Sequence, residues 1–201
     1  MPLTYLALGD SYTIGEAVPL ESSFPFQLMR KLRETGTQIN EPEIIATTGW
    51  TTDELIQAIK EKDLKSTYDL VTLLIGVNNQ YRGYSKENYR TEFNELLQTA
   101  IAYAGDNLKN VLVISIPDWG ITPFAQKSDR HAAKISAEID AFNAINKEEA
   151  LKADVAYIDI TPGSRKAAND LSLLAEDGLH PSGKMYAEWA DVLLNLLNSI
   201  N

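Results

Sequence analysis

The sequence contains no cysteine, which excludes disulfide bonds, thiolate metal ligands and cysteine nucleophiles. It contains only two histidines, His131 and His180, so any chemistry that needs an imidazole has two candidates. No apolar run approaches the roughly 20 residues that span a bilayer, and we expect no membrane insertion. Met1 and Pro2 lead straight into a predicted strand without the basic and apolar regions of a signal peptide, so the cytoplasm is the expected location.

Basic residues are also scarce. The chain has 18 lysines and arginines against 28 aspartates and glutamates, which gives a formal net charge of −10. Such an excess of negative charge repels nucleic acid and anionic membrane surfaces, and the basic residues form no cluster that would offset it. The sequence has no HExxH pattern or comparable set of metal ligands. We therefore expect no metal, no cofactor and no nucleic-acid partner, and a small molecule as the substrate.

Short apolar runs alternate with helical patterns along the whole chain. The runs predict five strands, at residues 4–8, 43–47, 70–75, 111–116 and 155–160. The intervening patterns predict helices at residues 24–35, after a capping box formed by Thr51 and Glu54, and at residues 86–104, 128–152 and 182–199. We expect the last helix to bury Trp189, Val192, Leu193, Leu196 and Leu197. This alternation predicts a doubly wound α/β fold with a parallel sheet, and residues 1–201 show no linker or repeat that would divide them into more than one domain.

The residues that follow the predicted strands carry the chemistry. The first strand ends abruptly in Gly9-Asp10-Ser11, and Asp177 and His180 stand just before the last helix. The carboxyl ends of parallel strands share one edge of a sheet, where ligands bind, so we expect these groups to meet there. Acyl transfer needs a nucleophile, a base and a group that orients the base. Ser11 can attack, His180 can take its proton, and Asp177 can hold the imidazole tautomer.

Donors for a developing oxyanion are expected at the same edge. The backbone N–H groups of Ser11 and Gly49 and the side-chain amide of Asn78, which follow the first three strands, are available for this role. Each residue also has a purely structural interpretation: serine caps helices, glycine forms turns, and asparagine satisfies backbone groups at strand ends. For the serine, the presence of Asp177 and His180 favours the catalytic interpretation.

Four motifs in order resemble those of the SGNH hydrolase family, also called GDSL esterases and lipases: Gly9-Asp10-Ser11, Gly49, Gly76-x-Asn78 and Asp177-x-x-His180-Pro181. The resemblance covers nearly the whole chain. It implies a flavodoxin-like three-layer α/β/α sandwich with a five-stranded parallel sheet. It further implies Ser11, Asp177 and His180 as the catalytic triad, and Ser11, Gly49 and Asn78 as the oxyanion hole. One position departs from the family pattern, because Asn79 stands where the family usually has aspartate.

These features predict a serine ester hydrolase that acts through an acyl-enzyme. We expect short-chain acyl or acetyl esters as substrates, because the segments after the strands are too short or too polar to form a lid. Trp50 and Trp119 are the expected wall of the substrate site. The alternatives are a lysophospholipase or thioesterase type of acyl hydrolase, and a non-catalytic binding protein on the same fold. A phosphate-binding loop is excluded, because Met185 replaces the serine or threonine that would follow Lys184.

Overall fold

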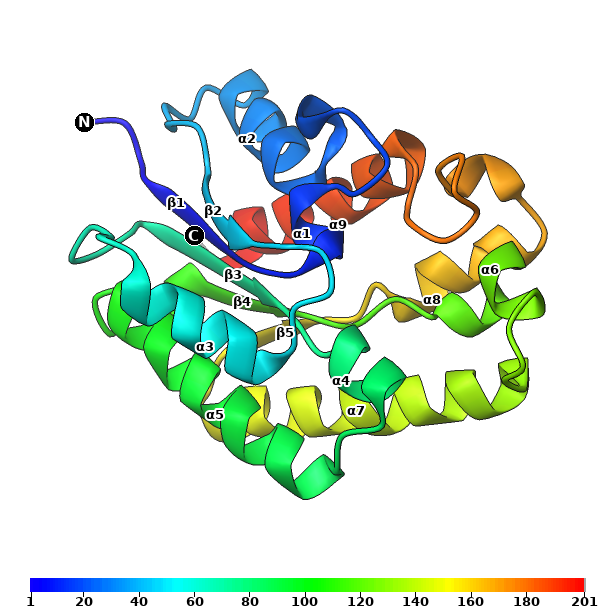
Figure 1. Cartoon of the computed structure of the whole chain (residues 1–201). Coiled ribbons are helices and arrows are strands. Elements are labelled where there is room, and N and C mark those ends of the chain that lie inside the picture. Colours follow the sequence, from blue (N-terminus) through cyan, green and yellow to red (C-terminus); the bar gives the residue numbers. More distant parts are fainter. Residues whose placement is uncertain (201) are drawn as a thin grey trace.

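A five-stranded parallel sheet forms the centre of the molecule (Figure 1). The computed structural model describes residues 1–200 and has the strand order β2-β1-β3-β4-β5. The strands are β1 (Tyr5–Gly9), β2 (Glu43–Ala46), β3 (Leu70–Leu74), β4 (Val111–Ile114) and β5 (Ala156–Ile158). The expected α/β fold is confirmed, and each strand lies within one or two residues of its predicted position. The strand order reverses its direction between β1 and β3, and such a switch point is where open α/β sheets bind ligands.

Helices cover both faces of the sheet (Figure 1). The helices α2 (Phe24–Glu34) and α9 (Gly183–Ile200) pack against each other on one face. The opposite face is covered by α3 (Thr52–Glu61), α5 (Lys86–Tyr103) and α7 (Ala132–Lys152). Within residues 1–200, no helix is both long and apolar enough to cross a bilayer.

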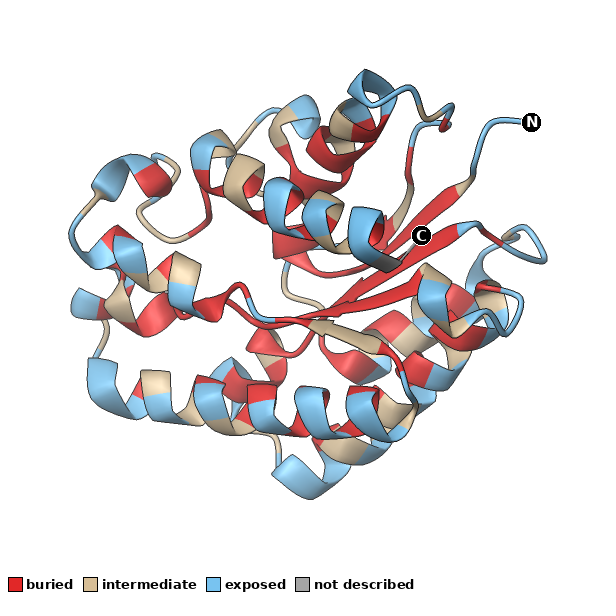
Figure 2. Cartoon of the chain, turned by 180° about the vertical axis from the view of Figure 1, so that it is seen from behind, coloured by how far each residue is buried: buried red, intermediate tan, exposed pale blue. Residues whose placement is uncertain are grey.

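The three central strands, β1, β3 and β4, are buried on both faces, which explains their nearly continuous apolar sequences. All five residues of β1 and all five of β3 are buried, and Figure 2 shows the buried positions concentrated on the sheet and on the inner sides of the helices. Complete burial of a leucine such as Leu8 or Leu73 stabilises the fold by about 1.5–3 kcal/mol relative to exposure. This rigid sheet holds the ends of its strands in fixed positions.

The capping box predicted for α3 is present. The backbone N–H of Thr51 donates to the Glu54 carboxylate at 2.9 Å, and this pairing satisfies a donor just before the first turn. Leu55 and Ile59 are buried, as a helical stripe that faces the sheet requires.

Two predictions about the long helices are wrong in detail. The helix α7 begins at Ala132 rather than at residue 128, and His131 is its N-cap residue. Ser128 instead closes the preceding turn, because its hydroxyl donates to the Ala125 carbonyl at 2.7 Å. In α9, Val192 is 46% exposed, whereas Trp189 and Leu193 are buried. The stripe that faces α2 recurs every three or four residues, and Val192 falls outside it.

Several short helices occupy segments that the sequence predicts as loops: α1 (Ser11–Ile14), α4 (Val77–Arg82), α6 (Pro123–Gln126) and α8 (Thr161–Ser164). Single turns of 3₁₀ helix lie at Leu20–Ser22, Leu108–Asn110, Trp119–Ile121, Arg165–Ala168 and Leu171–Leu173. Four to six residues are too few to form an apolar stripe with helical periodicity. The helix α4 is bounded by Gly76, with φ of 128°, and Gly83, with φ of 74°. At Gly76 a Cβ atom would lie 2.3 Å from the Tyr89 hydroxyl, so only glycine fits there.

Candidate active site

Ser11 lies where β1 passes directly into α1. Asp10 is the N-cap residue of α1, and its Oδ1 accepts a hydrogen bond from the Tyr12 N–H at 3.0 Å. This cap ends the strand and starts the helix without an intervening loop. Ser11 is therefore held rigidly at the carboxyl edge of the sheet, beside the switch point.

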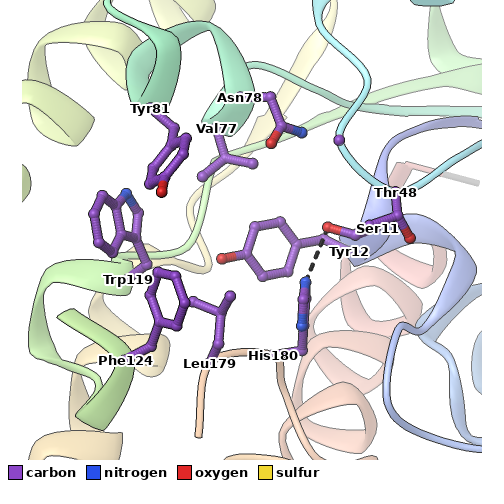
Figure 3. A pocket seen from close by; sticks show the side chains of 11 residues that line it. Ser11, Tyr12, Thr48, Val77, Asn78, Tyr81, Trp119, Phe124, Leu179 and His180 are labelled. Carbon is purple, nitrogen blue, oxygen red and sulfur yellow. Dashed lines mark hydrogen bonds between the residues drawn. The ribbon is translucent and has the colours of Figure 1, made fainter. Parts of the chain in front are cut away.

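The structure brings Asp177 and His180 to Ser11, and Figure 3 shows the His180 ring facing the Ser11 hydroxyl. His180 Nε2 lies 3.1 Å from Ser11 Oγ, and His180 Nδ1 lies 2.6 Å from Asp177 Oδ2. The second carboxylate oxygen, Asp177 Oδ1, accepts hydrogen bonds from the backbone N–H groups of Leu179 at 2.9 Å and His180 at 3.0 Å. One carboxylate thus fixes both the turn that carries the histidine and the ring orientation.

Asp177 is held in its ionised form. Partial burial raises the pKa of this carboxyl, but the hydrogen bonds from the His180 ring and from the two backbone N–H groups outweigh that effect and keep the pKa below its usual range. Ionised Asp177 accepts a hydrogen bond from a protonated His180 Nδ1. The other ring nitrogen, Nε2, is then unprotonated and can accept a hydrogen bond from the Ser11 hydroxyl. The arrangement can therefore remove a proton from Ser11.

Three donors lie beside the Ser11 hydroxyl. Within residues 1–200, the backbone N–H groups of Ser11 and Gly49 make no hydrogen bond to the protein, and Ser11, Gly49 and Asn78 line the same cavity. Gly49 has φ of 86°, a conformation that favours glycine. The Asn78 amide donates to the Trp50 carbonyl at 2.9 Å. An amide nitrogen carries two hydrogens, so this bond orients the group and leaves one donor free.

The neighbouring Asn79 makes hydrogen bonds within the protein rather than facing the cavity. It is fully buried, its Oδ1 accepts from the Thr52 N–H at 3.1 Å, and its Nδ2 donates to the Thr52 hydroxyl at 2.7 Å. The Thr52 hydroxyl donates in turn to Glu92. An aspartate at position 79 would lack the N–H for the second of these bonds. The asparagine therefore fits this chain's own hydrogen-bond network, which fastens α4 to the start of α3.

We expect the two asparagines to respond differently to substitution. Asn78→Ala should lower kcat by about 100- to 1,000-fold, or about 2.7–4 kcal/mol, because the candidate oxyanion donor is lost. Asn79→Ala should instead lower the free energy of unfolding by about 1–3 kcal/mol, because the buried Thr52 groups lose their partner. Steady-state kinetics and thermal unfolding of both variants separate the two effects. A larger loss of kcat in Asn79→Ala than in Asn78→Ala would reverse the assignment.

A cavity of about 210 Å³ opens beside Ser11 (Figure 3). Its lining residues are Ser11, Tyr12, Thr48, Gly49, Val77, Asn78, Tyr81, Trp119, Phe124, Leu179 and His180. Trp119, one of the two tryptophans expected at the substrate site, is part of this wall. Trp50 is not among the lining residues and reaches the site only through its carbonyl, which accepts from Asn78. Tyr12, next to the nucleophile candidate in the sequence, also lines the cavity, in addition to the expected Trp119.

A closed set of contacts holds Trp119 in place. The Trp119 indole N–H donates to Gln80 Oε1 at 2.8 Å, and Gln80 Nε2 donates to Glu138 Oε2 at 2.7 Å. Arg130 pairs with the same Glu138 oxygen at 2.7 Å and places its guanidinium 5.4 Å from the centre of the Trp119 ring. Tyr81 and Phe124 contact the indole edge to face, at centroid distances of 5.5 and 6.0 Å. The wall opposite Ser11 is therefore rigid.

Asp10 is a buried carboxyl with an unusual titration. Burial raises its pKa to about 7, and the hydrogen bond from the Tyr12 N–H offsets this only in part. Its second oxygen, Oδ2, has no hydrogen-bond partner within residues 1–200. The folded protein therefore binds a proton at Asp10 over a pH range in which the unfolded chain has already released it.

This shift predicts a stability that falls with pH. A raised carboxyl pKa stabilises the protein fully below about pH 4, and this contribution is lost as the pH rises through about 7. Three pKa units correspond to at most about 4 kcal/mol. Asp10→Asn cannot ionise, so its free energy of unfolding relative to the wild type should rise between pH 4 and pH 8. Denaturant unfolding across this range measures the difference, and parallel curves for the two proteins would contradict the expectation.

Within the described residues 1–200, no three histidine or acidic side chains gather as a metal site would require. What the arrangement can perform by itself is proton transfer from Ser11 to His180, next to three donors that can stabilise negative charge.

Comparisons with known proteins agree with this fold. No curated protein sequence matches the chain. Among solved structures, a lipase/acylhydrolase from Enterococcus faecalis superposes with a TM-score of 0.70 at 20% identity, covering 100% of this chain and 97% of that one. An acetyl xylan esterase from Geobacillus stearothermophilus gives 0.68 at 17% identity over 97% and 94% of the two chains, and TesA gives 0.69 at 17% over 98% and 99%. Because residues 7–188 match the GDSL-like lipase/acylhydrolase family, the protein belongs to that family.

Proposed function

We propose that the protein is a serine ester hydrolase in which Ser11 is the nucleophile, His180 the general base and Asp177 the group that orients the imidazole. The observation that carries this proposal is the hydrogen-bonded chain from Ser11 Oγ through both nitrogens of His180 to Asp177, with lengths of 3.1 and 2.6 Å. Membership in a family of lipases and acylhydrolases supports the reaction class. A protein that only bound a ligand would have no need for this chain of contacts.

In the first half of the reaction, Ser11 Oγ attacks the ester carbonyl carbon while His180 Nε2 takes the hydroxyl proton. The carbonyl π electrons move to oxygen, and the resulting oxyanion accepts hydrogen bonds from the backbone N–H groups of Ser11 and Gly49 and from Asn78 Nδ2. Collapse of this intermediate expels the alcohol, which receives its proton from His180. The acyl group remains on Ser11 as an ester.

In the second half, water replaces the alcohol. His180 removes a proton from the water as it attacks the acyl carbon, and the same donors stabilise the second oxyanion. When the bond to Ser11 Oγ breaks, His180 returns the proton to the serine and the carboxylic acid leaves. Ionised Asp177 stabilises the positive charge on the imidazole in both halves.

The substrate part of the proposal rests on the size of the cavity. Its volume of about 210 Å³ lies below the range of about 300–1,000 Å³ that drug-sized ligands occupy. Trp119 is 2% exposed and fixed by Gln80 and Arg130, so the wall has little freedom to withdraw. A small acyl or alcohol group fits this cavity, whereas a long acyl chain would extend out of it.

A series of nitrophenyl esters tests the proposed function. We expect kcat/KM to peak between acetate and butyrate and to decline by octanoate, because further methylenes gain no burial. A groove that continued to bury the chain would add about 0.8 kcal/mol per methylene. A value still rising at dodecanoate would favour a lipase or lysophospholipase, and no hydrolysis of any member would contradict the proposal. One similar structure is an acetyl xylan esterase, so acetylated sugars are the next substrates to assay.

A further inference from the structure

The hydroxyl of Tyr12 faces the cavity and has no hydrogen-bond partner among residues 1–200. Tyr12 is 3% exposed, and its side chain lines the cavity beside Ser11. In Figure 3 its ring lies between Ser11 and the aromatic wall, with the hydroxyl directed toward Trp119, Phe124 and Leu179. No side chain or backbone group among residues 1–200 makes a hydrogen bond to this hydroxyl.

The position of the Tyr12 ring is fixed by its neighbours. It packs against the His180 ring at a centroid distance of 5.5 Å and against Trp189 at 6.5 Å. Because Asp10 caps α1 through the Tyr12 N–H, the backbone of Tyr12 is held as well. The hydroxyl cannot turn toward another partner without disturbing the histidine that faces Ser11.

The hydroxyl is also available as a donor. Burial, together with the negative charges of Asp10, Asp177 and Asp118, raises the pKa of the Tyr12 phenol, which therefore keeps its proton at neutral pH. The nearby indole N–H is already used, since Trp119 donates it to Gln80. Tyr81 also lines the cavity but is 52% exposed as a residue, whereas Tyr12 is 3% exposed.

An apolar group that fills the cavity removes water from the Tyr12 hydroxyl and offers nothing in return. Leaving a buried hydrogen-bonding group without a partner costs about 1–3 kcal/mol, which a ligand oxygen at the same place would recover. Sites built around such a group discriminate against substrates that lack the matching polar atom.

We propose that Tyr12 selects esters that carry an oxygen in the part that occupies the cavity, so that a hydroxylated acyl or alcohol group is preferred over its apolar isostere. The inference rests on the proposed function and narrows its substrate class to esters of hydroxy acids or polyols. It adds a specificity-determining residue next to the nucleophile.

Two matched pairs of esters test the inference and distinguish a hydroxyl in the acyl group from a hydroxyl in the alcohol group. Nitrophenyl 3-hydroxypropanoate against nitrophenyl butyrate places the hydroxyl in the acyl group, and 2-hydroxyethyl acetate against propyl acetate places it in the alcohol. We expect the wild type to prefer the hydroxylated member of one pair in kcat/KM. Tyr12→Phe should lower that ratio about 10-fold, within the range for an unpaired hydrogen-bonding group.

Tyr103→Phe is the matched control, because it removes the same atom at the far end of α5 and should leave both ratios unchanged. Tyr12→Leu also lacks the hydroxyl and should show the same loss if Tyr12→Phe fails to fold. A merely structural role would lower kcat/KM for both members of a pair together and leave the ratio constant. An unchanged ratio in both Tyr12 variants of an active enzyme overturns the inference, whereas failure of the wild type on every ester overturns the proposed function.

Discussion

Ser11→Ala is expected to lower kcat by about a million-fold, the loss seen when the nucleophile of a serine hydrolase is removed, and to leave the fold intact. The hydroxyl is the only atom lost, and its partner is His180 Nε2 at 3.1 Å. In the proposed mechanism, removing it abolishes covalent catalysis, because the attacking oxygen is lost. Ester hydrolysis under single-turnover conditions measures the loss, and thermal unfolding verifies the fold.

Labelling by a fluorophosphonate gives the same test without a known substrate. The reagent should modify the wild type at Ser11 and leave Ser11→Ala unlabelled. Ser182→Ala is the matched control, since the Ser182 hydroxyl donates to the Ser172 carbonyl at 2.7 Å and lies only two residues from His180 in the sequence. Undiminished labelling of Ser11→Ala, or labelling lost in the control alone, would contradict the assignment of the nucleophile.

Asp177→Asn is expected to lower kcat by roughly 10,000-fold, with KM much less affected. The physical reason lies in how the carboxylate is used. Its Oδ1 accepts two backbone N–H groups, from Leu179 and His180, so the oxygen of an asparagine would take that place. The amide nitrogen would then face His180 Nδ1 and donate to it. The imidazole would carry its proton on Nε2, where it cannot accept one from Ser11.

The lowered pKa of Asp177 also determines how this residue contributes to the stability of the fold at different pH values. Since the pKa of Asp177 lies below its usual range, its stabilisation of the fold is complete above about pH 4 and is lost only as the pH falls through that lowered pKa.

Asp170→Asn is the control for the loss of kcat. It removes the same charge from an exposed aspartate that pairs with Lys184 at 2.8 Å, and kcat should not change. A loss of less than 10-fold in Asp177→Asn would show that the imidazole does not depend on this carboxylate.

The sheet and the residues at its carboxyl edge were predictable from the amino-acid sequence. Five apolar runs separated by helical patterns leave a parallel sheet as the solution that buries them, and β1 to β5 form that sheet. Ser11, Gly49 and Asn78 follow three adjacent strands, so their proximity is a consequence of parallel pairing. The placement of His180 and Asp177 beside Ser11 was predictable for a similar reason, because α9 begins at the same edge.

Which aromatic and polar side chains enter the cavity depends on contacts between segments that are separate in the sequence. Trp50 and Trp119 both lie near strand ends, yet only Trp119 lines the wall, because Gln80 and Arg130 from other segments hold its indole there. The hydrogen bond between Trp119 and Gln80 joins residues 39 positions apart, and no local pattern encodes it. The unpartnered hydroxyl of Tyr12 is of the same kind: strand and turn patterns place its backbone beside Ser11, but only the packing against His180 and Trp189 directs its side chain into the cavity.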